Sequence, residues 1–228
     1  MVTQADYVAK NAAMEIAERD PFTAERYQQF GRKLRPGVTT VLDVGSGPGR
    51  GGIALKALRP ALRIYGLDCV PSRIDRLPAE AYAGGYCGFS TASGIADASF
   101  DAIVAGEFIE HLTYADGIAS LAEFARILKP AGQILLTTPY PDYIRLLLTG
   151  GTTVGGAHLS AHYPRQLAVM LRDAGFVKVA WCGSGRVSRH VGESLPIWCY
   201  GSFLIQAELP ADGQPADGQP ADGQPAAG

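Results

Sequence analysis

Several polar residues follow directly after apolar runs that are typical of buried strands, where side chains can do chemistry. Glu107, Glu110 and His111 come after the run Phe100–Ala105. A histidine titrates near neutrality and can take a proton, so His111 is the candidate general base. The alternative is a structural histidine that bonds the backbone at a helix start. Glu107 is expected to line a ligand pocket, and Glu110 to cap the helix or to pair.

A glycine-rich loop of sequence DVGSGPGRGG begins at Asp43, at the end of the predicted strand Val38–Val44. The G-x-G-x-x-G pattern of dinucleotide-binding loops is satisfied by Gly47, Gly49 and Gly52. Asp43 argues against that ligand, because its carboxylate would meet a pyrophosphate of like charge. Pro48 also removes one backbone N–H from the loop. An ammonium and a sulfonium would instead be stabilised there, and S-adenosylmethionine carries both.

A second acid, Asp68, ends the next predicted strand, Arg63–Leu67, and lies 19 residues after Gly49. An acid at this position can accept hydrogen bonds from both hydroxyls of a ribose. Dinucleotide enzymes also bind the ribose through an acid at this position. Asp68 therefore indicates a nucleoside ligand but does not distinguish between the two cofactors. The alternative is an acid that caps the following turn.

His158 and His162 lie four residues apart in a long insertion, residues 139–163, after the predicted strand Gln133–Thr138. Two histidines at this spacing on a helix can bind a metal. Glycines before them and a proline after them disfavour a helix, and no third ligand is evident, so no metal is predicted. Loops of this length are often lids or binding loops. We therefore expect substrate contacts from His158, His162, Tyr140 and Tyr143.

The elements that position these residues alternate between strands and helices. Further strands are predicted at Val177–Trp181 and Ile197–Ala207, and helices at Gly51–Arg59, Gly117–Leu128 and Pro164–Ala174. Such alternation predicts an α/β fold, a parallel sheet with helices on both faces. Parallel sheets bind ligands at the carboxyl ends of their strands, so the functional residues should meet at one edge.

The composition of the chain disfavours several classes of protein. The chain has 228 residues, a net charge of −2, 47% hydrophobic and 18% charged residues. These values suit one folded domain and give no general attraction for nucleic acid. No apolar window is long enough to predict a membrane span. Four cysteines without a CxxC pair indicate neither a zinc ribbon nor a redox dithiol, and a cytoplasmic location is expected.

Five motifs in order carry a family resemblance: VLDVGSGPGRGG, GLD, DASFDAIVAGEFIEHL, LKPAGQILLTTP and LRDAGF. From Val38 to Phe176 the chain resembles class I S-adenosylmethionine-dependent methyltransferases, and most of all the ubiquinone-biosynthesis-like small-molecule enzymes (the type 11 group). The resemblance implies a Rossmann-like three-layer sandwich whose seven-stranded sheet has an antiparallel last strand. It also implies S-adenosylmethionine as cofactor, with Asp43, Gly45 and Gly47 at its methionine end and Asp68 on the ribose. Further cofactor contacts are expected from Ser46, Gly49, Cys69 and Glu107.

One position departs from the family pattern. Family members often carry an acid for the adenine amino group just before the segment GIADASFD, whereas this chain has Gly88–Ser93 there. We expect Ser90 or backbone groups to hold the adenine instead, with Phe89 or Ile95 packing on the ring.

The predicted organisation is one methyltransferase domain over residues 1–209. Residues 1–37 form N-terminal cap helices, around Ala5–Glu18 and Ala24–Leu34, that cover the acceptor together with the 139–163 lid. From Pro210 the sequence PADGQ repeats three times, and residues 210–228 are expected to be a disordered tail.

The leading hypothesis is methylation of a small molecule, at oxygen if His111 acts as the base. Methylation at nitrogen or carbon is the alternative within this class. A nucleic-acid base methyltransferase is not favoured, because Gly106-Glu107-Phe108 stands where such enzymes often carry an Asn/Asp-Pro-Pro-aromatic element. Two other classes are a dinucleotide-dependent oxidoreductase and a non-catalytic binding protein with the same fold.

Overall fold

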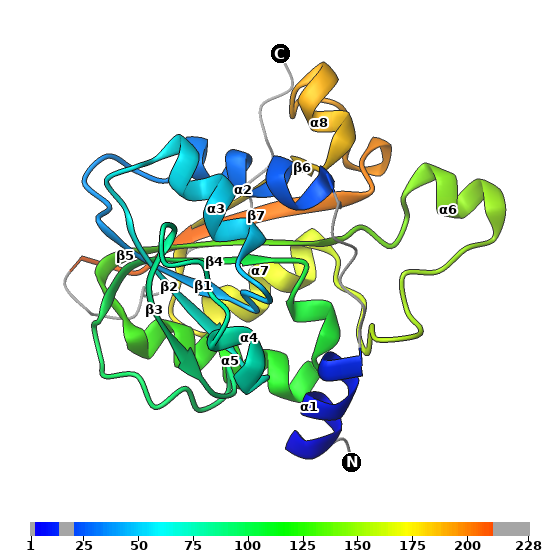
Figure 1. Cartoon of the computed structure of the whole chain (residues 1–228). Helices are drawn as coiled ribbons and strands as arrows, with labels where there is room; N and C mark the ends of the chain where they lie inside the picture. Colours follow the sequence, from blue (N-terminus) through cyan, green and yellow to red (C-terminus); the bar gives the residue numbers. More distant parts are fainter. Residues whose placement is uncertain (1–2, 14–20, 212–228) are drawn as a thin grey trace.

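Seven strands form one sheet in the order β3-β2-β1-β4-β5-β7-β6 in the computed structural model, which describes residues 3–13 and 21–211 (Figure 1). The strands are β1 (Thr40–Val44), β2 (Arg63–Asp68), β3 (Tyr82–Cys87), β4 (Phe100–Gly106), β5 (Leu128–Pro139), β6 (Val177–Ser184) and β7 (Ser202–Glu208). Strands β1 to β5 pair in parallel, and β7 runs antiparallel to both β5 and β6. The predicted fold class is confirmed.

Helices cover both faces of this sheet (Figure 1). One layer holds α2 (Pro21–Lys33), α3 (Arg50–Leu58) and α8 (Arg186–Val191), and the other holds α5 (Tyr114–Ile127) and α7 (Pro164–Asp173). Side chains alternate across β1, so Val41 packs with Phe30 and Leu55 of the first layer, while Leu42 packs with Phe124 of the second. Two apolar cores, one on each face, therefore fix the register of the central strand.

The remaining helices lie around the edges of the sandwich. They are α1 (Gln4–Ala13), α4 (Pro71–Ile74), α6 (Ile144–Thr149) and the 3-10 turns η1 (Ile109–His111) and η2 (Ile197–Cys199). The hydroxyl of Tyr7 joins α1 to the start of α5, because it donates to Asp116 and accepts from the backbone N–H of Thr113. Helix α6 projects from the body of the molecule (Figure 1), and Leu148 on it is 81% exposed.

Three sequence expectations differ from the structure. The apolar pattern does not predict β3, because YAGGYC has two glycines at its centre and pairs only with β2 at the sheet edge. The predicted strand Ile197–Ala207 is wrong at its start, where η2 precedes β7. The insertion 139–163 contains the short helix α6, which its sequence pattern does not indicate.

The described chain extends two residues into the segment predicted as a tail. The carbonyl of Pro210 accepts a hydrogen bond from the backbone N–H of Ala131, so the chain still contacts the sheet at that residue. Residues 212–228 of the predicted tail, and residues 14–20 of the predicted N-terminal helices, lie outside the described residues. Among the helices of the described part, none is long and apolar enough to cross a membrane.

Candidate functional site

The carboxyl ends of β1, β2 and β4 open into a cavity of about 360 Å³. That volume lies within the roughly 300–1,000 Å³ typical of small-molecule sites. The predicted site residues that line it are Gly45, Gly47, Asp68, Cys69, Ser90, Glu107 and His111. Residues from four separate stretches of sequence thus meet at one edge of the sheet, as the parallel topology requires.

Where the glycine loop lines the cavity, at Gly45 and Gly47, the lining atoms are backbone atoms. Gly45 has φ +68°, which favours glycine, and a Cβ there would lie 2.7 Å from the ring of Phe108. Gly49 has φ +87°, and a Cβ there would lie 2.5 Å from Pro78. A side chain at either position would therefore strain the loop and displace its neighbours. Helix α3 begins directly after Gly49.

Asp43 lies beneath the loop rather than in the cavity wall. The alternation of β1 points its side chain to the same face as Val41, where its two oxygens accept hydrogen bonds from the hydroxyls of Tyr27 and Tyr82. Burial raises the pKa of Asp43 to about 7, although both phenols oppose the shift. Its observed contacts join the strand end to α2 and β3, and so support the loop from below.

Two other loop residues also lie outside the cavity lining. Ser46 is buried, and its hydroxyl has no hydrogen-bond partner within the described part of the chain. Gly49 is buried against Pro78 and Tyr82. Of the loop residues predicted to contact a ligand, the structure therefore brings Gly45 and Gly47 to the cavity, and it places Asp43, Ser46 and Gly49 behind them.

The Tyr82 hydroxyl links Asp43 to helix α3, and removing this hydroxyl tests whether the link stabilises the fold. It donates to Asp43 and accepts from the backbone N–H of Gly52. Tyr82→Phe leaves a buried acceptor and a buried donor unsatisfied, so we expect a loss of about 1–3 kcal/mol in unfolding free energy, measured by denaturant titration. Tyr86→Phe, on the same strand, is the control, and equal stability of the two variants would contradict the role assigned to Tyr82.

Asp68 is buried at the end of β2 and forms part of the cavity wall. One carboxylate oxygen accepts from the backbone N–H of Gly47 at 3.0 Å and from Arg73 at 3.3 Å, and the other accepts from the backbone N–H of Val70 at 2.9 Å. A carboxylate has about four acceptor positions. Asp68 thus ties the loop to β2, and the three hydrogen bonds named here do not use all of its acceptor positions.

The segment expected to hold the adenine contributes Gly88, Phe89, Ser90 and Thr91 to the cavity wall. The hydroxyl of Ser90 lies 2.7 Å from that of Ser120 in α5. Ile95, the other expected ring contact, is instead part of the apolar core. Cys69 also lines the cavity, and burial raises the pKa of its thiol to about 11, so the thiol is neutral at pH 7.

The turn after β4 begins at Glu107, whose φ of +53° is unusual for a residue other than glycine. Its backbone N–H donates to the carbonyl of Thr137 at 3.0 Å. Its carboxylate lies 3.5 Å from the Arg26 guanidinium and accepts a hydrogen bond from the Ser202 hydroxyl. Contacts from α2 and from two strands therefore hold Glu107 in the cavity wall.

Glu110 belongs to η1 in this turn and is 1% exposed. One oxygen accepts from the Thr138 hydroxyl at 3.0 Å, and the other has no hydrogen-bond partner among residues the structure describes. Burial raises the pKa of Glu110 well above its usual value, and the charge of Glu107 adds to the shift. The backbone carbonyl of Glu110 accepts from the N–H groups of Leu159 and Ser160, which fastens the returning insertion to η1.

His111 lines the cavity, and His158 packs against it from the insertion. The two ring centroids are 4.9 Å apart in an edge-to-face arrangement. His111 Nδ1 lies 3.2 Å from the carbonyl oxygen of Ala157, and His158 Nδ1 lies 2.8 Å from that of Thr153. Burial, with a smaller contribution from His158, lowers the pKa of His111 to about 4, so its ring is neutral at pH 7.

None of the four predicted substrate contacts lines the cavity, and His158 comes nearest to it through His111. His162 is fully buried, its Nε2 is 2.8 Å from the Ser160 hydroxyl, and burial lowers its pKa to about 4. Tyr140 packs edge-to-face on Phe203, and Tyr143 lies beside Gly201. Tyr140 and Tyr143 thus pack at the start of β7, whereas His162 packs against Tyr114 of α5.

The opposite wall of the cavity comes from the N-terminal helices. It consists of Gln4, Tyr7 and Asn11 of α1 and Thr23 and Arg26 of α2. The sequence indicates that these helices cover a site, but no motif singles out the residues of α1 that line it. Arg26 and Asn11 carry no motif, and only the folded contacts show that they reach the cavity.

Comparison with known proteins agrees with this geometry. Residues 42–136 match the family model described as a methyltransferase domain. A Mycobacterium tuberculosis protein described as a probable S-adenosylmethionine-dependent methyltransferase is 31% identical over 165 residues, which is 69% of this chain and 57% of that protein. The demethylmenaquinone methyltransferase of Deinococcus radiodurans is 35% identical over 163 residues, 60% of this chain and 67% of that protein.

Comparison with solved structures also finds the methyltransferase fold. A crystal structure of an S-adenosylmethionine-dependent methyltransferase from Archaeoglobus fulgidus has a TM-score of 0.63 and 18% identity, and the match covers 81% of this chain and 92% of that one. At that identity the likeness concerns the fold alone. Taken with the sequence relatives and the cavity at the strand ends, it leads to one conclusion: the chain belongs to the class I S-adenosylmethionine-dependent methyltransferases.

Proposed function

We propose that the protein transfers a methyl group from S-adenosylmethionine to a hydroxyl group of a small molecule. The observation that carries this proposal is a single cavity whose walls include both the glycine loop with Asp68 and the turn with His111. A cofactor held on the first wall and an acceptor held on the second would face each other. Orientation of the two reactants is the main contribution an enzyme makes to such a reaction.

The cofactor wall has the chemical groups that S-adenosylmethionine needs. Gly45 and Gly47 offer backbone without a side chain, and Asp68 offers a buried carboxylate for the two ribose hydroxyls. Ser90 and the backbone around it would contact the adenine, and Cys69 would pack beside the ribose. When bound, the cofactor supplies a methyl group activated by its sulfonium. Asp43 would act indirectly, because the loop rests on it.

The acceptor wall has groups suited to a polar small molecule. His111 would assist removal of the acceptor's proton, since a neutral hydroxyl is a poor nucleophile. Glu107 would orient the acceptor from the same turn, with Arg26 beside it. Helix α1 would close the cavity, because Tyr7 fastens it to the start of α5. The Deinococcus relative is named for a small-molecule acceptor, which supports the same substrate class.

The test is transfer of a labelled methyl group. The full chain is incubated with methyl-labelled S-adenosylmethionine and a panel of phenols, quinols, polyols, amines and carboxylic acids. We expect labelled product with hydroxyl acceptors, and label found solely on nitrogen or carbon would contradict O-methylation. Calorimetry with S-adenosylhomocysteine and with NADH separates the other classes, because binding of NADH alone would indicate an oxidoreductase.

The proposed compartment is the cytoplasm. All four cysteines lie in the described part of the chain, and all are free thiols. Free thiols persist where the environment is reducing. Fractionation of cells, with antibody detection of the protein in the soluble and membrane fractions, tests this placement.

A further inference from the structure

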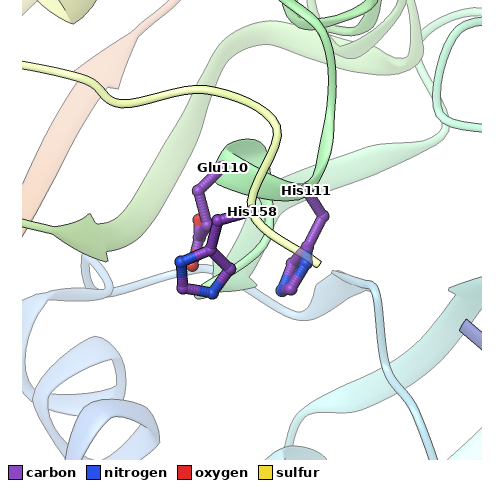
Figure 2. A group of neighbouring side chains, drawn as sticks. All are labelled: Glu110, His111 and His158. Atoms are coloured by element: carbon purple, nitrogen blue, oxygen red, sulfur yellow. The ribbon is translucent and has the colours of Figure 1, made fainter. Parts of the chain in front are cut away.

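Three side chains beside the cavity form a cluster that the proposed cofactor contacts do not explain. Glu110 and His111 leave the same turn, η1, and His158 comes to them from the insertion (Figure 2). One ligand atom from each lies within 4.8 Å of the others. Around a tetrahedral first-row cation with bonds of about 2.0–2.2 Å, two ligand atoms lie about 3.3–3.6 Å apart. Binding would therefore draw the three side chains together by up to about 1.5 Å.

The contacts around the cluster leave one ligand atom of each residue available. A carbonyl oxygen can only accept, so the Nδ1 atoms of His111 and His158 donate to Ala157 and Thr153. In each neutral ring this leaves Nε2 with a lone pair. Histidine ligands of metals commonly donate their other ring N–H to a backbone carbonyl in this way.

The Glu110 carboxylate also keeps one ligand atom available. One oxygen of Glu110 accepts from Thr138, and the other is buried without a hydrogen-bond partner in the described residues. An unpaired buried carboxylate oxygen is costly, and a cation beside it would remove that cost. No hydrogen bond within the described part joins Glu110 to either histidine, so direct pairing does not account for the cluster.

We propose that Glu110, His111 and His158 bind a divalent first-row transition-metal cation. Two imidazoles and one carboxylate suit such ions and leave coordination positions open. The open positions would face the acceptor, because His111 forms part of the cavity wall. Glu107, three residues before Glu110, is a further carboxylate of the cavity wall, where it contacts Arg26 and Ser202.

The role of this cation rests on the proposed methylation of a hydroxyl group. A bound cation lowers the pKa of a coordinated hydroxyl. The acceptor would lose its proton to solvent, and its oxygen electron pair would form the new bond to the methyl carbon. The electrons of the broken C–S bond would remain on sulfur. The products are the methyl ether, S-adenosylhomocysteine and one proton, and His111 would then assist deprotonation as a ligand of the cation.

The experiment titrates Co²⁺ alone into the full, chelator-treated chain, followed by calorimetry and by visible absorption, which reports the ligand set. We expect one cation per chain, and His158→Ala should weaken binding at least ten-fold. His190→Ala, which removes an exposed histidine of α8, should bind Co²⁺ as the parent does. His158→Gln is the second variant if His158→Ala does not fold.

A separate readout keeps this inference distinct from the proposed function. Affinity for S-adenosylhomocysteine is measured on the same samples, with and without chelator, and should not change. If the cofactor product binds and Co²⁺ does not, or if the His158 variants bind Co²⁺ as tightly as the parent, the metal site is wrong and the methyltransferase proposal stands. If S-adenosylhomocysteine fails to bind to the parent, the proposed function itself fails.

Discussion

Replacing His111 by alanine is expected to lower the rate of methyl transfer to a hydroxyl acceptor by about 10²–10⁴-fold, the usual contribution of a group that assists proton removal. His111 is the histidine that lines the cavity, at the carboxyl edge of β4 where the methyl donor should lie. The cofactor wall is formed by other residues, so affinity for S-adenosylhomocysteine should remain within a few-fold of the parent. The rate is measured with the best hydroxyl acceptor from the panel.

His190→Ala is the matched control for this variant, because it removes an exposed histidine far along the chain in α8. A rate for His111→Ala within a few-fold of the parent would remove His111 from the chemistry. Loss of the folded state, detected by circular dichroism, would show that the contact with Ala157 is structural, and would likewise count against an assisting role.

Asp68→Ala is expected to weaken binding of S-adenosylhomocysteine by about ten-fold or more, measured by calorimetry. Hydrogen bonds to a charged group contribute roughly 1.5–3 kcal/mol, and the variant also frees the backbone N–H groups of Gly47 and Val70. Asp75→Ala removes an exposed acid seven positions later and should bind like the parent. Unchanged affinity in folded Asp68→Ala would place the ribose elsewhere.

Sequence reasoning was sufficient for the fold because the strands of this sheet have simple patterns. Runs such as Gln133–Thr138 are buried on both faces, with an unbroken apolar centre at Ile134–Leu136, and they are bounded by glycine or proline. The edge strand β3 has no such signal, because one of its sides has no partner strand and its two central glycines hide the alternation. The family resemblance supplied the seventh strand that the pattern missed.

The site was less predictable where contacts come from distant parts of the chain. Asp43 ends a strand and so was expected to face the ligand, but the period of two residues points it toward Tyr27 and Tyr82. That outcome follows from β1 itself, since Val41 and Asp43 share one face. His158 had no comparable signal. Its approach to His111 depends on how the insertion folds back, with Ala157 contacting His111 across 46 positions.

The spacing of His158 and His162 does not predict a metal pair, because the glycines before them and the proline after them disfavour a helix. The structure separates these two histidines, since His162 is buried against Tyr114 and Ser160. It brings His158 instead to Glu110 and His111 on another element. Local spacing predicts clusters within one helix, whereas a cluster shared by a turn and a loop requires the folded chain.

A crystal structure of the chain with S-adenosylhomocysteine tests the central claim most directly. We predict that the ligand occupies the cavity at the ends of β1, β2 and β4, with its ribose hydroxyls bonded to Asp68 and its sulfur directed toward the His111 wall. The ligand bound at another surface, or bound here with its ribose away from Asp68, would contradict the account.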